Sequence, residues 1–302
     1  MDETQAFAEE RPRLISLAYR MLGSVAEAED VVQEAFVRLH AALTAGEVID
    51  SVPAFLTTVT TRVAIDHLRS ARVRRERYVG AWLPEPLLTD RSSDVAERVE
   101  TTESLSIAFL VVLETLSPVE RAVFLLHDVF GYGYDEIAPI VEKSVENARQ
   151  IAVRARKHIE ARRPRFEPSP EERDELARRF FAAVVAGDVD GLVRMLAADA
   201  IVVGDGGGKA PALSTPVVGA ERVARFLAGL SRFGARYGLS GRFAEVNGRP
   251  GLVVVDDDGR IASVAAIDIS DRKVRAVHSI ANPDKLRHLG EILDLASLVE
   301  RA

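Results

Sequence analysis

Residues 117–159 restrict the fold of this chain most, because three short amphipathic segments follow one another there with tight turns between them. Ser117 is followed by Pro at the first helical position and by Glu three residues later, which predicts a capped helix over about 118–130. A Gly-Tyr-Gly turn precedes a second helix, 135–141, and a four-residue turn precedes a third, from 145 to about 159. This pattern predicts a helix-turn-helix.

The third of these helices has two distinct faces at about 100° per residue. Its core-facing stripe, about 100° wide, is Ala148, Ile151, Ala152, Ala155 and Ile159. Amide and charged groups near its start can read base edges, and Arg and Lys can contact phosphates. The side chains that we expect at DNA are Ser144, Glu146, Asn147, Arg149, Gln150, Arg154 and Lys157. The alternative is a surface helix with a solvated charged face.

The length of 302 residues predicts two or three domains, each large enough for its own core, and the hydrophobic fraction is that of an ordinary soluble protein with a net charge of −7. The absence of cysteine excludes disulfides, thiolate metal sites and a Cys nucleophile. No apolar run approaches the roughly 18 residues of a membrane span, and the charged first twenty residues do not resemble a secretory signal. We therefore expect a cytoplasmic protein that does not associate with a membrane.

The N-terminal segment predicts helices with two candidate binding faces. One helix, opened by a capping box at Ser24, buries an apolar stripe and exposes an acidic face with an isolated valine: Asp30, Gln33, Glu34, Val37 and Arg38. A later helix leads into residues 62–77, which hold six arginines in sixteen residues and favour phosphate contact. Its candidate DNA-binding residues are Arg62, Asp66, Arg69, Arg72, Arg74 and Arg75.

These motifs resemble a known family. The run 30–36 (Asp-Val-Val-Gln-Glu-Ala-Phe), followed by 64–69 (Ala-Ile-Asp-His-Leu-Arg), looks like region 2 of an extracytoplasmic-function (ECF) sigma factor, and the helix-turn-helix resembles region 4. The resemblance covers about residues 5–160. It implies that the face around Asp30 docks on the clamp helices of the large subunit of RNA polymerase core, with a further contact to the flap. It also implies that the Arg62 group meets the −10 element and the Glu146 group reads the −35 element.

Two residues depart from the family pattern. Pro139 falls inside the first helix of the helix-turn-helix, where it removes a backbone donor. Glu142 occupies the turn where the family usually has Gly, at a cost of about 1 kcal/mol if its φ is positive. We expect a locally adjusted turn.

The C-terminal part changes from helical to strand periodicity. A capping box at Ser169 predicts a first helix, a second holds Leu192 and Met195, and strands are expected at 200–203, 242–246, 252–255, 261–269 and 274–280. Helices followed by an antiparallel sheet indicate an α+β domain. It resembles the SnoaL-like, nuclear-transport-factor-2-like (NTF2-like) cone. The expected fold is thus two all-α sigma domains followed by this α+β domain.

Three separated motifs match the ECF group that carries such an extension. They are the linker motif Trp82, Leu83 and Pro84, the run Asp205, Gly206, Gly207, Gly208 and Lys209, and the run Asn282, Pro283, Asp284, Lys285 and Leu286. In that group the extension takes the place of a separate anti-sigma protein, so the resemblance implies regulation within one chain. Asn282 can cap a final helix, and the glycines can let another segment approach closely. The glycine run could instead be only a mobile loop.

Enzymatic interpretations are weaker. The glycine run fails the phosphate-loop and dinucleotide templates, and the Asp256–Asp258 turn lacks the ligand spacing of an EF-hand. His278 and His288 have no acid–base partner set by spacing. We therefore predict no catalytic residue, no metal and no cofactor.

The predicted domains are 1–78 (region 2), 79–104 (linker), 105–163 (region 4), 164–170 (linker) and 171–302 (regulatory). The predicted function is a sigma factor that binds RNA polymerase core and promoter DNA, without a separate anti-sigma factor. Two alternatives come from other classes: a ligand-sensing one-component DNA-binding regulator, and a DNA-tethered enzyme of the polyketide-cyclase type.

Overall fold

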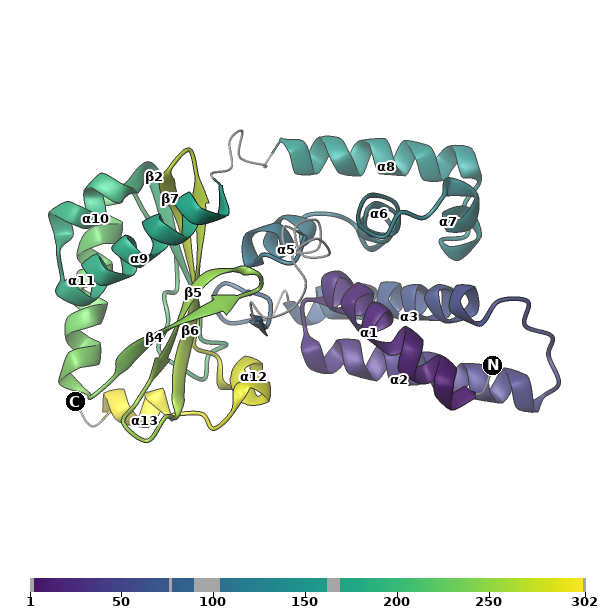
Figure 1. Ribbon diagram of the computed structural model, residues 1–302, viewed down its shortest axis with the longest axis horizontal. Coiled ribbons are helices and arrows are strands. Elements are labelled where there is room, and N and C mark those ends of the chain that lie inside the picture. The colour runs from purple at the N-terminus through teal and green to yellow at the C-terminus, as the bar shows by residue number, and fades with distance from the viewer. Residues whose placement is uncertain (1–2, 76–77, 90–103, 162–168, 301–302) are drawn as a thin grey trace. The chain divides into compact units, whose positions relative to one another are not determined.

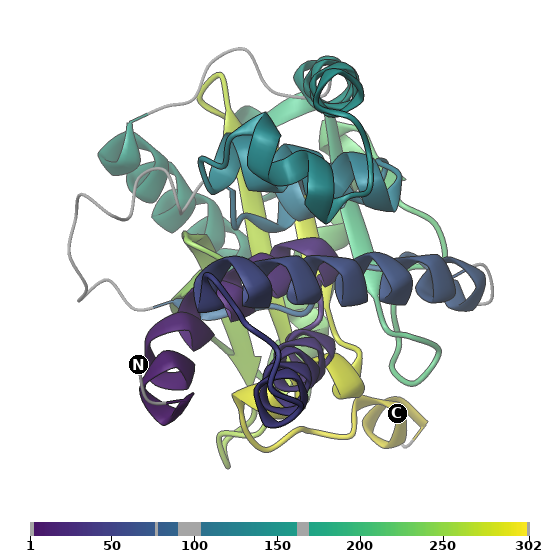
Figure 2. The same ribbon diagram turned by 90° about the vertical axis from the view of Figure 1, so that its right-hand side faces the viewer.

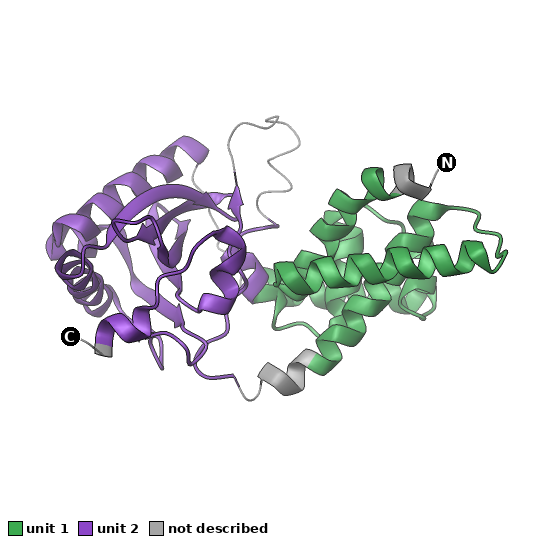
Figure 3. Ribbon diagram, turned by 90° about the horizontal axis from the view of Figure 1, so that it is seen from below, with its two compact units in different colours: residues 1–77, 112–162 green, residues 78–111, 163–302 purple. Residues whose placement is uncertain are grey.

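The computed structural model describes residues 3–75, 78–89, 104–161 and 169–300. The chain forms two compact units, each made of two separate stretches (Figure 3). Unit 1 comprises Met1–Arg77 and Val112–Arg162, and unit 2 comprises Tyr78–Val111 and Arg163–Ala302.

The first part of unit 1 is a three-helix bundle of α1 (Glu3–Leu22), α2 (Val25–Thr44) and α3 (Val52–Arg75), which Figures 1 and 2 show from two sides. The Ser24 side chain accepts a hydrogen bond from the Glu27 amide, so the predicted cap of α2 is confirmed. Pro12 lies within α1 and not at its start. The helices meet through fully buried apolar side chains: Leu14, Leu17, Met21, Leu22, Val31, Val32, Leu39 and Leu56.

The second part of unit 1 confirms the helix-turn-helix prediction. The first predicted helix is divided into α6 (Pro118–Phe124) and a π-helical turn η1 (Leu125–Val129). It is followed by α7 (Tyr134–Ile140) and α8 (Val145–Glu160). The capping box at Ser117 is present, and the Ser144 hydroxyl accepts from the Asn147 amide at the start of α8. All five residues of the predicted core stripe of α8 are buried.

Unit 2 is built on a seven-stranded sheet. Its strands are β1 (Leu88–Thr89), β2 (Leu196–Asp205), β3 (Val217–Val218), β4 (Ser240–Val246), β5 (Arg249–Val255), β6 (Ile261–Ser270) and β7 (Lys273–Ile280). The spatial order is β1-β4-β5-β6-β7-β2-β3. The antiparallel prediction needs one correction, because β2 pairs with β7 in parallel. After β2 the chain passes through β3 and a helix (Ala220–Arg236) to β4, near the opposite edge of the sheet. The strands β4 to β7 then lead back until β7 lies beside β2, which is the long connection that a parallel pair needs.

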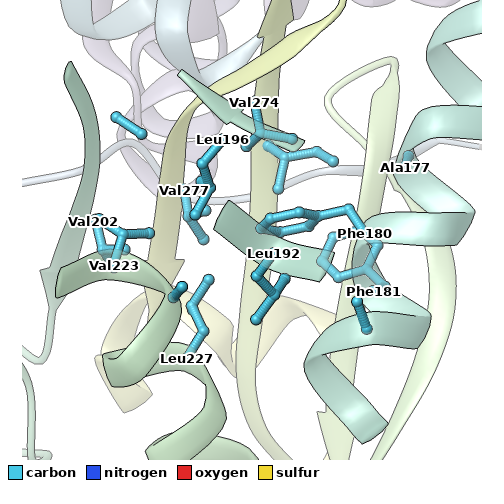
Figure 4. Close-up of a cluster of buried hydrophobic side chains, with 14 of the residues drawn as sticks. Ala177, Phe180, Phe181, Leu192, Leu196, Val202, Val223, Leu227, Val274 and Val277 are labelled. Carbon is cyan, nitrogen blue, oxygen red and sulfur yellow. The ribbon is translucent and has the colours of Figure 1, made fainter. Parts of the chain in front are cut away.

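Three helices cover one face of this sheet: α9 (Pro170–Ala186), α10 (Val189–Met195) and α11 (Ala220–Arg236). Figure 4 shows Phe180 and Phe181 of α9 directed at Leu192 and at strand residues such as Val274 and Val277. The α+β prediction is confirmed, and the domain is of the SnoaL-like type. Neither α11 nor the two-residue strand β1 was predicted.

The other face of the sheet carries a second apolar cluster, because successive strand residues point to opposite faces. Leu83 of the linker, Ile107 of α5 (Ile107–Leu113) and Leu286 of α12 (Pro283–Leu286) pack there against Val246 and Ile280. The chain then continues through η2 (Arg287–Leu289), forms a bridge between Ile261 and Ile292, and ends its described part in α13 (Leu295–Glu300). The linker and the C-terminal segment therefore share one side of the sheet.

Across the described ranges, no helix combines the length and the apolar character that spanning a membrane requires. The same residues contain no cluster of three or more His, Asp or Glu side chains placed to hold a metal ion.

Candidate functional site

The three regulatory motifs predicted from the sequence meet at the carboxylate of Asp205, at the end of β2. Asp205 is fully buried, and its Oδ2 accepts from the amide of Leu83 at 2.8 Å and from Lys285 Nζ at 2.7 Å. Its Oδ1 accepts from the Tyr78 hydroxyl at 2.5 Å. One carboxylate thus binds two positions of the linker and one of the C-terminal motif. We call Tyr78, Trp82, Leu83, Asp205, Asn282 and Lys285 the linker clamp.

Lys285 completes the clamp as a buried cation. Its side chain is 8% exposed, and besides Asp205 it donates to the carbonyl of Leu83. Its Nζ lies 4.2 Å from the centroid of the Trp82 ring and 5.0 Å from that of Tyr78, so two aromatic faces contact the ammonium group. Burial, followed by the bond to Asp205, raises the pKa of the Tyr78 hydroxyl well above its usual value. Tyr78 therefore acts as a neutral donor.

The glycine run lets the linker approach this site. A Cβ on Gly207 would lie 2.2 Å from Asn282 Nδ2 and 3.0 Å from the Tyr78 hydroxyl, and a Cβ on Gly208 would lie 3.2 Å from Val79. Both glycines have positive φ, 58° and 71°. The prediction of a close backbone approach is therefore confirmed. Beside it, Lys209 pairs with Asp284 at 2.5 Å on the surface.

Asn282 and Pro283 start a helix, α12, as predicted, but it is not the final one, because α13 follows it. The Asn282 Oδ1 accepts from the Asp284 amide, and its Nδ2 donates to the Tyr78 hydroxyl at 2.8 Å. Leu286 is fully buried. Of the predicted linker residues, Leu83 enters the apolar cluster and Trp82 covers Lys285. Pro84 is buried beside them and, as a proline, has no amide hydrogen to donate.

A second anchor of the linker, at Asn247, was not predicted as a site. Asn247 is fully buried in the β4–β5 turn with φ 52°. Its Oδ1 accepts from the Leu87 amide at 2.8 Å, its amide donates to the Leu87 carbonyl, and its Nδ2 donates to the Leu105 carbonyl at 2.9 Å. Its side chain therefore joins both ends of the segment that contains residues 90–103. The sequence signal, Asn-Gly, predicted only the turn, which is confirmed.

The linker also forms strand β1, which pairs Leu88 with Val246 and Thr89 with Glu245. The Thr89 hydroxyl donates to Glu245 Oε1 at 2.8 Å, and His288 Nε2 lies 2.8 Å from the carbonyl oxygen of Pro86. A cavity of about 530 Å³ opens beside this strand, lined among others by Leu88, Arg178 and Phe243. The linker is therefore an integral part of unit 2.

His278 is a buried histidine on the same sheet, between Val203 of β2 and Ala266 of β6. Desolvation lowers its pKa from 6.5 to about 4. Because the unfolded chain takes up this proton at higher pH, the stability from neutral His278 is present above pH 6.5 and is lost as the pH falls toward 4. The total loss is about 3 kcal/mol at 1.4 kcal/mol for each pKa unit.

We expect His278→Leu to flatten the acid branch of the stability curve between pH 6.5 and 4. Denaturant unfolding at several pH values measures this, with His40→Gln on the exposed face of α2 as the control. An equally steep acid branch in the His278 variant would contradict the prediction.

In unit 1, the predicted polymerase-binding residues lie together on the exposed face of α2. Asp30, Gln33, Glu34, Val37 and Arg38 are all exposed, and Val37 is 61% exposed among charged neighbours. Arg38 donates to Glu34 at 2.6 Å, one turn earlier. The helix therefore presents one apolar side chain framed by charges.

The predicted −10 residues lie along α3. Arg62, Asp66 and Arg69 are exposed, and Arg69 pairs with Asp66 at 2.8 Å. The side chains of Arg72, Arg74 and Arg75 lie outside the described residues. Arg62 has protein partners here: it donates to the carbonyls of Ile140 at 3.0 Å and Pro139 at 2.7 Å. These carbonyls end α7 and have no intrahelical donor, so Arg62 caps that helix.

Other contacts join the two parts of unit 1. Arg121 of α6 is 3% exposed and donates to the Met21 carbonyl at 2.6 Å, and burial lowers its pKa to about 9. Arg13 donates to the hydroxyls of Tyr132 and Thr57. The three-helix bundle and the helix-turn-helix are thus held together by three arginines, Arg13, Arg62 and Arg121.

The predicted −35 residues lie on one face of α8. Glu146, Arg149, Gln150, Arg154 and Lys157 are exposed, Asn147 is half-buried, and Ser144 caps the helix. Arg154 lies 3.9 Å from Glu120, and the Arg149 guanidinium lies over the Tyr134 ring. This face is rich in donors and has no apolar residue except Val153 among its central positions.

Both departures from the family pattern are visible. Pro139 lies inside α7, where its carbonyl accepts from Arg62. Glu142 has φ 55°, so the condition under which this residue carries a backbone cost is met at a residue that is not glycine. Its carboxylate lies 3.6 Å from Arg62.

Comparisons with known proteins agree with this arrangement. Residues 6–74 match the family model described as Sigma-70 region 2, and residues 106–159 match Sigma-70, region 4. The chain is 41% identical to the ECF RNA polymerase sigma factor SigJ of Mycobacterium tuberculosis over 94% of this chain and 93% of that protein. It is 34% identical to a probable ECF sigma factor, SigI, of the same species over 93% of each. The crystal structure of SigJ superposes with a TM-score of 0.73 at 35% identity, covering 94% of this chain and 98% of that one.

A Sigma-70 region 2 followed by a Sigma-70 region 4 defines a transcription initiation factor, here with a further α+β domain. The chain belongs to the family of ECF RNA polymerase sigma factors.

Proposed function

We propose that this sigma factor directs RNA polymerase core to promoters and that unit 2 regulates it within the same chain, without catalysis and without a separate anti-sigma factor. The observation that carries the regulatory part is the linker clamp. The linker connects α3 with α5 and α6. Anchoring the linker at Asp205 and Asn247 therefore limits how far the predicted −10 residues of α3 can separate from the predicted −35 residues of α8.

In this proposal, the conformation in which the linker is bound at Asp205 is the one in which the activity of the sigma factor is restrained. Arg62, expected at the −10 element, is engaged by the carbonyls of α7, and Arg13 and Arg121 hold the two DNA-binding parts together. Core polymerase would bind the open arrangement better and so shift the population toward it. Family membership supports this function over a regulator that works without polymerase.

The cavity beside β1 favours a second, related function, control by a small ligand. Its walls include Leu88 and Thr89 of the linker together with Phe243 and Glu245 of β4. A ligand held there would contact the clamped linker directly and shift the same equilibrium.

The test is transcription in vitro with purified polymerase core, comparing the full-length chain with one ending at Phe166 and one ending at Ala281. We expect promoter-specific transcripts from the full chain and more transcripts from the chain ending at Phe166, because the part of unit 2 that anchors the linker is removed. A chain that supports no transcript in any form, although folded, would contradict the sigma function. Equal activity of all three would contradict regulation by unit 2.

A further inference from the structure

A row of arginines on unit 2 is not used by the clamp. Residues 222–244 contain five arginines and no acidic residue, in a chain whose net charge is −7. At 100° per residue, Arg222, Arg225, Arg232 and Arg236 fall within an arc of about 80° on α11. All four are exposed, while Val223, Ala224, Leu227 and Ala228 bury the opposite side of the helix. We call these four residues the arginine stripe.

The stripe is largely available for a partner. Arg225 pairs with Glu221 at 2.9 Å, but both side chains are about 70% exposed, where such a pair contributes little. Arg222, Arg232 and Arg236 make no ion pair with any other described residue. Gly229 lies on the same face, and a Cβ there would have no atom within 4 Å. The stripe is therefore an exposed, positively charged surface with open space at Gly229.

The dimensions of the stripe match a polyanion with regular charges. From Arg222 to Arg236 the helix rises about 21 Å at 1.5 Å per residue. Duplex DNA carries one negative charge for roughly each 1.7 Å of its axis, so a stripe of this length passes several phosphates. Guanidinium groups also suit phosphate oxygens, because two N–H donors can bind one phosphate.

Chain connectivity limits the distance between the end of α8 and the start of α9. Nine residues separate the end of α8 at Glu160 from the start of α9 at Pro170. Nine residues span at most about 35 Å. Because α8 is the helix expected to read the −35 element, DNA that flanks this element is within reach of a tether of this length.

An anionic membrane is a less suitable partner. The apolar row beside the stripe is mostly engaged within unit 2, since Phe226 packs on the core and the Phe233 ring lies 4.6 Å from Tyr237. Leu230, at 48% exposure, adds little apolar area for insertion.

We propose that the arginine stripe of α11 binds the phosphate backbone of the DNA that flanks the −35 element, as a third DNA contact besides regions 2 and 4. The contact rests on the proposed sigma function, and it adds affinity without reading sequence.

The test uses holoenzyme reconstituted from core polymerase and the full chain. Its affinity is measured by fluorescence anisotropy, at several salt concentrations, for a transcribed promoter fragment that extends about 20 base pairs, or two duplex turns, upstream of the −35 element. The variant is Arg222→Glu with Arg232→Glu. The matched control is Arg179→Glu with Arg194→Glu, which makes the same charge change at exposed positions of α9 and α10.

We expect the stripe variant to bind about tenfold more weakly and to lower the slope of log affinity against log salt by about 2, since each phosphate contact contributes about 0.9. The control and a fragment that ends at the −35 element should show neither effect. If the variant and the wild type bind DNA equally while the wild type still transcribes, the proposed DNA contact of the arginine stripe is wrong, but the sigma function is not.

Two other results would also overturn the proposal. A variant that fails to bind polymerase core without DNA would assign the stripe to the polymerase surface. Loss of binding to phosphatidylglycerol vesicles, with DNA binding unchanged, would assign it to a membrane.

Discussion

Replacing Asp205 by Ala is expected to lower the free energy of unfolding of unit 2 by about 3–5 kcal/mol, because it leaves the buried ammonium of Lys285 without its anion. The Leu83 amide and the Tyr78 hydroxyl also lose their acceptor. Trp82 is the only tryptophan of the chain and lies over Lys285, so its fluorescence reports the clamp directly. Denaturant unfolding followed at Trp82 measures the change.

Two further variants separate the clamp from general damage. Lys209→Ala removes the neighbouring pair with Asp284, whose side chains are 56% and 40% exposed, and it should cost less than about 1 kcal/mol. Asp205→Asn keeps the shape of the side chain while removing its charge. We expect this variant to release the linker and to raise transcription in vitro. If Asp205→Asn stays folded with unchanged Trp82 fluorescence and transcription, the clamp does not restrain the sigma factor.

The helix-turn-helix could be predicted from the sequence because its determinants are local. Ser117 and Ser144 cap helices whose first turns follow them directly, and the stripe from Ala148 to Ile159 repeats with the helical period. The sequence marked the turn at Glu142 as a departure from the family pattern, and the structure supplies its φ of 55°.

The linker clamp could be predicted only as a set of motifs. Asp205 lies 122 residues from Leu83 and 80 from Lys285, and no periodicity connects positions so far apart. The resemblance marked Trp82, Asp205 and Lys285, but it did not show that one carboxylate binds all three segments. Tyr78, the last residue of the predicted region 2, was missed because an isolated tyrosine at that boundary has no distinguishing local pattern.

Three features of the fold were not predicted, each for a different reason. Strand β1 has two residues and exists only because Leu88 and Thr89 pair with β4, so its formation depends on tertiary contacts. Helix α11 did carry a signal, because Val223, Ala224 and Leu227 repeat with the helical period. The parallel pairing of β2 with β7 followed from the long path through α11, which strand periodicity alone cannot show.

Substitutions at the proposed −35 interface are expected to have the largest effect on promoter choice. Arg149 and Gln150 lie exposed near the N-terminal end of α8, where a recognition helix contacts base edges. Each good base contact contributes about 1–3 kcal/mol of discrimination. Arg149→Ala with Gln150→Ala should therefore lower transcription from a −35-dependent promoter roughly 100-fold and reduce the preference between −35 sequences.

Arg156 offers a matched control on the same helix. It donates to Asp128 at 2.6 Å, and that hydrogen bond raises its pKa, so its guanidinium serves the internal packing of region 4. Arg156→Ala should leave the preference between −35 sequences unchanged, with a loss of stability of about 1 kcal/mol. Transcription with a library of −35 variants distinguishes the two substitutions. If the Arg156 variant alters the preference and the Arg149–Gln150 variant does not, the assignment of Arg149 and Gln150 to base contacts is wrong.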